Sequence, residues 1–277
     1  MPPFSGYTAA LSLLQAALVA LPRPRQPFGW MPSSAWWALV PAGSIVVVVG
    51  AIEFEPAAAD LLTWLALVAV PPLAALALAA LVRGSRPLWA LGAALLLAIA
   101  IVSNGSLAGE AAAAALSCLA CVSLGWLLVC VVPAVWLRIG IYAMAAVDAA
   151  LVGAEVLQGP SGVLSSADPG GLPRLQVVEL GTARIGFGDA FVAATVGCLL
   201  IDSADGPKTG DIGHFAARRQ LEFAGLVAIL GLAFDFLFLF LDTLPATVPP
   251  AIALAIAERR GPRAEPEPRS ERAPPQL

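Results

Sequence analysis

Long apolar runs, separated by shorter polar connections, make up most of the sequence. A helix that spans a membrane needs roughly 20 mainly apolar residues, and lengths of about 17 to 25 are tolerated. Nine runs approach or reach this length. The pattern therefore predicts an all-α polytopic membrane protein with nine transmembrane helices, at residues 5–21, 35–52, 60–82, 88–102, 109–132, 139–157, 185–201, 219–241 and 244–257.

The positions of the basic residues fit nine spans. Connections alternate between the two sides of a membrane, and Lys and Arg concentrate in those on the cytoplasmic side. Of the 15 basic residues, 13 follow odd-numbered runs, and only Arg174 and Arg184 lie on the opposite side. We therefore expect an N-terminus outside the cell, a cytoplasmic C-terminus, and a location in the plasma membrane of a microbe.

The composition excludes a water-soluble globular protein. Hydrophobic residues make up 59% of the chain and charged residues 12%, and the mean hydropathy is +0.86. Soluble domains carry roughly 25% charged residues, so the lipid bilayer has to cover most of this surface. A net charge of −4, with basic residues scattered over several connections, argues against a nucleic-acid partner. The four cysteines lie inside apolar runs, which favours packing over disulfide bonds.

The predicted spans form a single domain, residues 1–257, in which residues 1–132 hold the N-terminal helices and residues 139–257 hold helices six to nine. Residues 258–277 are rich in Pro, Glu and Arg, so we expect a disordered cytoplasmic tail. No cleavable signal peptide is expected, because no basic region precedes the first run. Partly alternating β-branched residues predict a short strand at residues 175–180.

Three carboxyl groups fall inside the predicted spans, where each costs about 2.5 to 3.5 kcal/mol on insertion scales. Asp148 lies near the middle of the sixth span. Asp189 lies near the outer start of the seventh span, at the end of the sequence Gly-Phe-Gly-Asp. Asp235 lies in the eighth span, where we favour a polar contact between helices over a role in a water path. Each of these residues needs a partner or a function.

Asp148 and Asp189 are predicted to lie at the same depth in the membrane. Asp148 comes seven residues before Glu155, and Asp189 comes five residues after Arg184. At 1.5 Å per helical residue, both lie about 8 to 10 Å below the outer surface. Because consecutive antiparallel helices are commonly neighbours, we expect the two carboxyl groups to meet.

A pair of carboxyl groups in one water-filled site has a defined chemistry. Both groups cannot easily ionise, so they hold one proton between them. One carboxylate takes a proton from water while its protonated partner polarises a peptide carbonyl, which is general acid and base catalysis. The two aspartates alone also fit a structural hydrogen bond between helices, or a proton or ion pathway.

The sequence around both aspartates resembles the GxGD intramembrane aspartyl proteases, the presenilin and signal peptide peptidase family. That family carries Gly-x-Gly-Asp at the start of its seventh helix, which is matched in full by Gly186, Phe187, Gly188 and Asp189. Its sixth-helix aspartate corresponds to Asp148, with Val147 in place of the usual tyrosine. The chain is thus similar to a divergent microbial member.

The family's third motif, Pro-Ala-Leu at the start of the ninth helix, is matched in part. Its residues correspond to Pro245, Ala246 and Thr247, with threonine in place of leucine. A second register is offered by Pro250, Ala251 and Ile252. In the family this region helps to position the substrate, and the resemblance implies the same role here.

The resemblance implies a presenilin-like fold with Asp148 and Asp189 as the catalytic residues and with no cofactor or metal ion. The implied partners are transmembrane peptide substrates, either transmembrane segments or signal-peptide remnants, while the natural substrate and any partner subunits stay open. Signal peptide peptidases have the orientation predicted here, so we expect substrates whose N-terminus lies in the cytoplasm. An unwound substrate segment would add as a strand to residues 175–180.

Two other functions remain open from the sequence. Prepilin peptidases also carry GxGD, usually followed by a basic residue and often accompanied by a cluster of four cysteines in a cytoplasmic loop. Here Ala190 and Phe191 follow the motif, and the sequence has no such cluster. A proton-coupled transporter would use Asp148, Asp189 and Asp235 as carriers. Transporters often contain internal repeats, and none is evident in this sequence.

Overall fold

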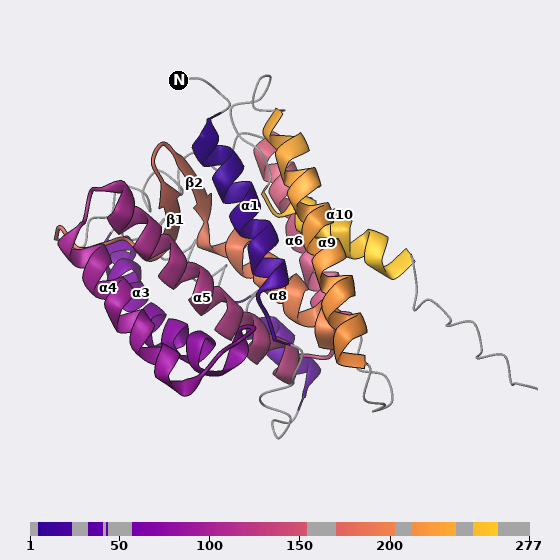
Figure 1. Ribbon diagram of the computed structural model, residues 1–277. Helices are drawn as coiled ribbons and strands as arrows, with labels where there is room; N and C mark the ends of the chain where they lie inside the picture. Colours follow the sequence, from indigo (N-terminus) through magenta and orange to yellow (C-terminus); the bar gives the residue numbers. More distant parts are fainter. Residues whose placement is uncertain are drawn as a thin grey trace, which may run out of the picture.

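The computed structural model describes residues 5–23, 33–40, 43, 57–153, 170–202, 212–236 and 246–259. These residues are mainly helical, which confirms the predicted all-α class (Figure 1). The described α-helices are α1 (Gly6–Ala20), α3 (Ala57–Leu76), α4 (Leu91–Val102), α5 (Leu107–Val131), α6 (Ala134–Gly153), α8 (Phe187–Asp202), α9 (Ile212–Asp235) and α10 (Val248–Arg259). The shorter elements are the 3-10 helices η1 (Ala35–Ala38) and η3 (Pro87–Ala90), the π-helix η2 (Ala77–Leu81), and the strands β1 (Val177–Leu180) and β2 (Ala183–Gly186).

Eight of the nine predicted spans overlap an α-helix in the described part of the chain. Most of the second predicted span lies outside the described residues. Several boundaries differ from prediction: α6 begins at Ala134 rather than at residue 139, and α9 begins at Ile212 rather than at residue 219. Each of these helices begins before a basic residue, Arg138 in α6 and Arg218 in α9, that the prediction leaves in a connection. Backbone hydrogen bonds continue through such residues.

Length and composition allow two of the described helices to cross a membrane, at Asp60–Leu81 and Leu107–Val131. The apolar helices at Gly6–Ala20 and Pro87–Val102 are shorter. A spanning helix needs roughly 17 residues or more, so these two fall below the usual length. The two longer helices support membrane association of the chain. They do not support the predicted set of nine transmembrane helices.

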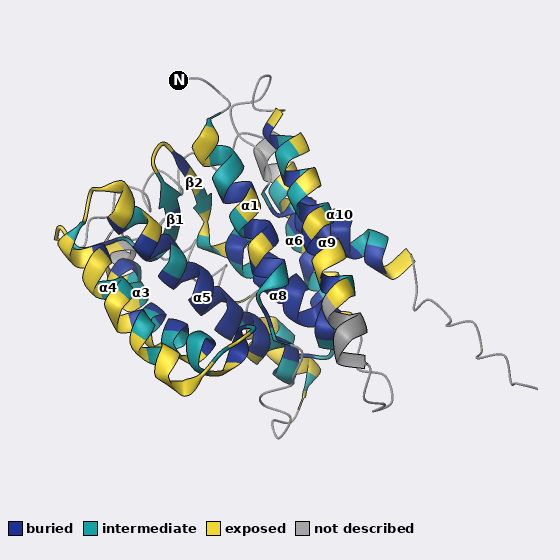
Figure 2. Cartoon of the chain, viewed as in Figure 1, coloured by how far each residue is buried: buried dark blue, intermediate teal, exposed yellow. Residues whose placement is uncertain are grey.

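Helix α5 lies at the centre of one half of the fold and is buried along most of its length (Figure 2). It contacts α3, α4, α8 and β1. Small residues make this possible, because Ala, Ser, Cys and Gly let neighbouring helices approach closely. A Cβ atom added at Gly125 of α5 would lie 3.2 Å from the backbone of Thr195 in α8. The position of α8 is therefore fixed by backbone packing against α5.

Helix α1 joins the hairpin to the other helices, because it contacts β2, α8 and α9 (Figure 1). Its approach to α8 is even closer than that of α5. A Cβ atom added at Gly197 of α8 would lie 2.6 Å from the carbonyl oxygen of Val19. Helix α10 in turn contacts α6, α8 and α9. Helix α8 is thus held between α5 on one side and α1 on another, and α10 connects it to α6.

The outer faces of α3 and α4 expose large apolar side chains (Figure 2). Exposed apolar patches of this extent on a protein mark contact with a partner or with lipid. The exposed side chains include Leu61, Trp64, Leu65 and Val68 on α3 and Leu91, Leu95 and Val102 on α4. Their number and position fit a helix pair whose outer surface faces lipid chains.

A two-stranded antiparallel hairpin precedes α8. Its register pairs Val177 with Gly186 and Leu180 with Ala183. The predicted strand at residues 175–180 is confirmed over Val177–Leu180. The seventh helix was expected from residue 185, but β2 continues through Gly186 and α8 begins at Phe187. Pairing with β1 satisfies the backbone groups of this segment, which keeps it extended.

We expect Gly197→Ala to lower the free energy of unfolding by about 1 to 3 kcal/mol, because its Cβ would overlap the backbone of α1. Gly225→Ala in α9 is the matched control, since a Cβ there meets nothing within 4 Å. Alanine favours a helix over glycine by about 1 kcal/mol, so the control should be neutral or slightly stabilised. Denaturant unfolding of the purified protein in detergent measures both variants. Equal stability of the two would contradict the close packing of α1 on α8.

Candidate active site

Asp148 and Asp189 come from different helices and lie within electrostatic range of each other. Asp148 lies in α6, and Asp189 lies in the first turn of α8. The negative charge of Asp148 acts on the carboxyl group of Asp189. Both residues are half-buried. Helix α10 contacts α6 and α8 and so lies against both helices that supply a carboxyl group.

The change from strand to helix places Asp189. Strand β2 ends at Gly186, whose backbone N–H donates a 3.1 Å hydrogen bond to Oδ2 of Asp189. A Cβ atom at Gly186 would itself lie 3.1 Å from that oxygen, so glycine leaves room for the carboxyl group. Helix N-termini also favour negative charge. The backbone at this junction therefore holds the carboxyl group of Asp189 in place.

Phe187 and Gly188, the other two residues of the Gly-Phe-Gly-Asp motif, differ in their surroundings. Phe187 packs partly buried against the apolar core, and its carbonyl oxygen lies 3.8 Å from Sγ of Cys121 in α5. Gly188 is exposed, and a Cβ added there would meet nothing within 4 Å. Phe187 therefore anchors the start of α8, whereas Gly188 leaves an open surface directly beside Asp189.

Thr247, the residue that precedes α10, forms two hydrogen bonds with Asp148. Its side-chain hydroxyl donates a 2.7 Å hydrogen bond to Oδ2 of Asp148, and its backbone N–H donates a 3.3 Å bond to the same oxygen. The neighbouring Ala246 is held by α1, since its carbonyl oxygen accepts a 3.2 Å hydrogen bond from Nε2 of Gln15. Pro245 lies outside the described residues. Of the two segments that the resemblance offers, this one is in hydrogen-bond contact with Asp148.

The second register lies within the body of α10. Pro250 and Ala251 are buried in its first turns, and Ile252 is half-buried. No hydrogen bond between this segment and Asp148 is found among the described residues. Prolines fit the first turn of a helix because the N–H groups there have no partner within the helix. We therefore assign Pro250 and its neighbours to the start of α10.

The other end of α10 is also bound to α6. The hydroxyl group of Tyr142 donates a 2.9 Å hydrogen bond to Oε2 of Glu258. Nε of Arg138 lies 3.1 Å from Oε1 of the same carboxylate. Arg219 of α9 donates a 3.2 Å hydrogen bond to the carbonyl oxygen of Ala257. Helix α10 is thus fixed at both ends, which holds Thr247 against the sixth helix.

Asp235 makes a separate contact between helices. Its Oδ2 accepts a 2.9 Å hydrogen bond from the hydroxyl group of Ser12 in α1. The side chain is only 6% exposed. This contact joins α1 to α9 and confirms the prediction of a polar contact between helices.

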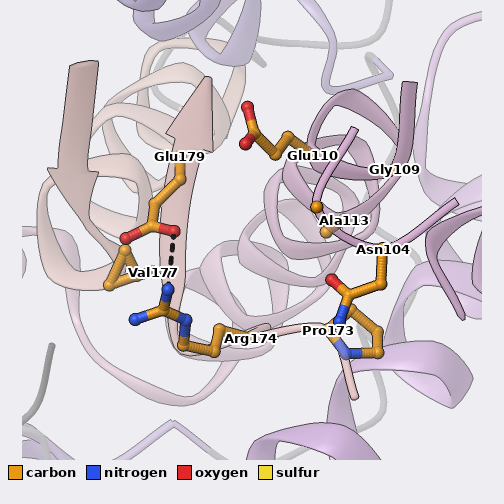
Figure 3. Close-up of a pocket in the computed structure, with 9 residues that line it drawn as sticks. Asn104, Gly109, Glu110, Ala113, Pro173, Arg174, Val177 and Glu179 are labelled. Carbon is orange, nitrogen blue, oxygen red and sulfur yellow. Dashed lines mark ion pairs between the residues drawn. The ribbon is translucent and has the colours of Figure 1, made fainter. Parts of the chain in front are cut away.

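A polar pocket on the hairpin side of the fold lies between α5 and β1 (Figure 3). It is lined by Asn104, Gly105, Gly109, Glu110, Ala113, Pro173, Arg174, Val177 and Glu179. Neither Asp148 nor Asp189 lines it. In the part of the chain that the structure describes, no group of three or more His, Cys, Asp or Glu side chains is arranged to hold a metal ion.

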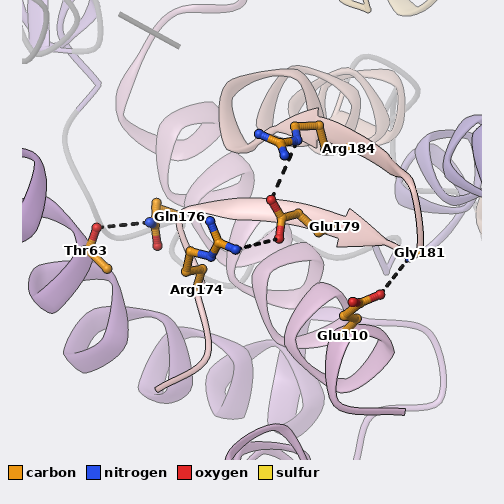
Figure 4. Close-up of polar contacts among 7 residues, drawn as sticks. All are labelled: Thr63, Glu110, Arg174, Gln176, Glu179, Gly181 and Arg184. Carbon is orange, nitrogen blue, oxygen red and sulfur yellow. Dashed lines mark hydrogen bonds and ion pairs between the residues drawn. The ribbon is translucent and has the colours of Figure 1, made fainter. Parts of the chain in front are cut away.

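Polar side chains around this pocket join the hairpin to α5 and link its two strands to each other (Figure 4). Glu110 at the start of α5 accepts a 2.6 Å hydrogen bond from the backbone N–H of Gly181. Glu179 lies 3.7 Å from Nη2 of Arg174 and 3.7 Å from Nε of Arg184. These contacts hold β1 and β2, and therefore the strand that leads into Asp189.

Neither the second strand nor the direct contact of Thr247 with Asp148 was predicted from the sequence. A signal for the strand exists, because Gly181 follows the predicted strand and glycine commonly marks a tight turn. The hydroxyl of Thr247 had no comparable signal. Its partner lies 99 residues away in the sequence, so only the fold brings the two groups together.

Comparison with protein-family models, with curated proteins and with solved structures finds no match to this chain. The resemblance to the GxGD proteases therefore rests on the sequence motifs alone.

We expect Ser12→Ala to lower the free energy of unfolding by about 1 to 3 kcal/mol, because the buried carboxyl group of Asp235 loses a hydrogen-bond donor. Leu13→Ala is the control on the same helix, since its side chain is exposed. Denaturant unfolding in detergent compares both variants with the unchanged protein. A Ser12→Ala protein as stable as the control would show that this hydrogen bond does not support the packing of α1 on α9.

Proposed function

We propose that this chain is an intramembrane aspartyl protease of the GxGD type, with Asp148 and Asp189 as its catalytic residues. It would hydrolyse peptide bonds within transmembrane segments or signal-peptide remnants. The observation that carries the proposal is that α10 contacts both helices that supply a carboxyl group, with Thr247 hydrogen-bonded to Asp148, while the charge of Asp148 acts on the carboxyl group of Asp189. Groups of this kind perform general acid and base catalysis when they share a proton.

The proposed reaction needs only water and the two carboxyl groups. The ionised carboxylate removes a proton from water, whose oxygen attacks the carbon of the peptide carbonyl. The protonated carboxyl group donates its proton to the carbonyl oxygen, which gives a tetrahedral intermediate. The intermediate then breaks its C–N bond, as one carboxyl group protonates the departing nitrogen and the other recovers a proton from oxygen. The products are a carboxylic acid and an amine, and the pair returns to its initial state.

Access for the substrate is supported by the surroundings of Asp189. A helical peptide bond is shielded by its own turn, so the substrate has to unwind before hydrolysis. The β1–β2 hairpin leads directly into the motif, and an extended substrate segment can add to a strand edge through backbone hydrogen bonds. The open surface at Gly188 leaves space for a substrate backbone next to the carboxyl group.

The proposal includes nine transmembrane helices with the N-terminus outside and the C-terminus in the cytoplasm. Thirteen of the 15 basic residues lie on alternate connections, and this distribution supports the orientation. The exposed apolar faces of α3 and α4 support contact with lipid. In this orientation the enzyme would accept substrates whose N-terminus lies in the cytoplasm, as the signal peptide peptidases do.

The proposed activity predicts that the purified protein cuts a transmembrane reporter peptide. Asp148→Ala and Asp189→Ala should each abolish cutting, because each variant lacks one member of the acid–base pair. Asp235→Asn is the control, since Asp235 is engaged with Ser12 and is not part of the pair. This variant should retain most of the activity. Mass spectrometry of the reporter fragments measures all three variants.

Cutting that survives in either alanine variant would reject the two-aspartate mechanism. Absence of cutting by the unchanged protein, together with proton flux in vesicles that requires Asp148, Asp189 and Asp235, would favour a proton-coupled transporter instead.

The proposed orientation predicts that an epitope tag after Leu277 is protected from an impermeant reagent in intact cells. A tag placed before Ser5 should be labelled from outside in the same cells, because the N-terminus is expected on that side. Labelling of the C-terminal tag in intact cells would exclude this orientation and the substrate direction that follows from it.

A further inference from the structure

Thr247 gives both of its hydrogen-bond donors to a single carboxyl group. The hydroxyl lies 2.7 Å and the backbone nitrogen 3.3 Å from Oδ2 of Asp148, and the threonine is only 3% exposed. We propose that Thr247 is a positioning residue that keeps Asp148 as the ionised base, so that Asp189 carries the shared proton and acts as the acid. This assignment rests on the proposed protease function and gives each carboxyl group one role.

The hydroxyl of Thr247 is available because the helix that follows does not need it. A threonine just before a helix usually accepts a hydrogen bond from the N–H of the second or third helical residue. In α10 these residues are Pro249 and Pro250, which have no N–H group. The side chain therefore has no partner in its own helix and turns to Asp148. Leucine, which the family motif carries at this position, has no hydroxyl and could not make this bond.

Two donors favour the ionised form of a carboxyl group. A hydrogen bond from N–H or O–H is stronger to a carboxylate than to a protonated carboxyl group. Among the described residues, Asp148 accepts two such bonds from Thr247, whereas Asp189 accepts one, from the backbone N–H of Gly186. When the pair holds one proton, that proton is thus better placed on Asp189.

The charged groups around Asp148 do not reverse this assignment. Asp189 of α8 is the acidic group that interacts electrostatically with it, and η1 and residues 246–257 carry no ionisable side chain. On α6 itself, Arg138 and Tyr142 lie one to three turns before Asp148, where both bind Glu258 at the far end of α10. The N-terminus of α8 and one hydrogen bond favour the charged form of Asp189, whereas Asp148 has two hydrogen bonds from Thr247, one of them a short bond from a hydroxyl group. Within the described residues, the hydroxyl of Thr247 is therefore the contact on which this assignment depends.

This assignment completes the proton transfers of the reaction. Asp148 takes the proton from water as the water oxygen bonds to the peptide carbon, and Asp189 gives its proton to the carbonyl oxygen. Asp148 then passes its new proton to the departing nitrogen as the C–N bond breaks. Asp189 regains a proton from the hydroxyl group of the intermediate. Each cycle consumes one water molecule and leaves both carboxyl groups as they began.

The test compares Thr247→Val, which keeps the size and the backbone N–H but removes the hydroxyl, with Thr247→Ser, which keeps the hydroxyl. A hydrogen bond to a charged group contributes about 1.5 to 3 kcal/mol, and one pH unit corresponds to about 1.4 kcal/mol. Loss of the hydroxyl makes the ionised base easier to protonate. The acid limb of the pH profile of reporter cleavage should therefore move up by about 1 to 2 pH units in Thr247→Val and return to its position in Thr247→Ser.

Infrared spectra over the same pH range give a readout that does not depend on cleavage. Asp148→Asn and Asp189→Asn identify the carboxyl band of each residue in the purified full-length protein. The pH at which the Asp148 band changes should rise by about 1 to 2 units in Thr247→Val and be restored in Thr247→Ser. Thr247→Ala, which removes the hydroxyl without a larger side chain, should give the same rise and serves if the valine variant does not fold.

The outcomes separate this inference from the proposed function. A shifted Asp148 band in a protein that never cuts the reporter would support the role of Thr247 and reject the protease. A protein that cuts the reporter, with an Asp148 band and acid limb unchanged in the valine and alanine variants, would overturn the role of Thr247 and leave the protease in place.

Discussion

The cost of placing carboxyl groups among apolar helices governs how this structure is organised. A carboxyl group in such surroundings needs hydrogen-bond donors or a neighbouring group that shares its charge. Asp235 meets this need with Ser12, in a contact that joins α1 to α9. Asp189 takes a backbone donor from the end of β2, and Asp148 takes two donors from Thr247. The first contact joins two helices and, among the described residues, involves no other acid, whereas the other two lie at acids whose charges act on each other. That difference separates a structural aspartate from two candidate catalytic ones.

Close backbone packing supplies the rigidity that such a pair requires. Gly125 and Gly197 bring α8 against α5 and α1, so the helix that carries Asp189 is fixed from two sides. Helix α10 is bound to α6 through Thr247 at one end and through Glu258 at the other. The contact of Glu110 with the hairpin turn holds the strand that precedes α8. A catalytic geometry has to be held within fractions of an ångström by its supporting contacts. Here α8, α10 and the hairpin are each held by one of the contacts just described.

Much of the fold follows from the sequence because apolar length and local motifs carry it. Eight of the nine predicted apolar runs overlap described helices, and the strand at Val177–Leu180 was predicted from its β-branched residues. The partner strand was missed, since its segment continues into the apolar run that was predicted as the seventh helix from residue 185. The contact of Thr247 with Asp148 was also missed, because it joins distant parts of the chain. The count of nine spans depends on the alternation of basic residues between connections. Helix length does not support it, because a helix such as α10 has only 12 residues.

The most direct test of this account asks whether the two carboxyl positions meet in the membrane. Cysteines placed at Asp148 and Asp189, in a protein whose four native cysteines are replaced by alanine, can be treated in native membranes with a short bifunctional thiol reagent. Cysteines at Ser12 and Asp235 provide the positive control, because those side chains are in hydrogen-bond contact. The account predicts that both pairs are cross-linked, as detected by the altered mobility of the chain after proteolysis between the two positions. A cross-link in the control pair without one between positions 148 and 189 would contradict the shared site.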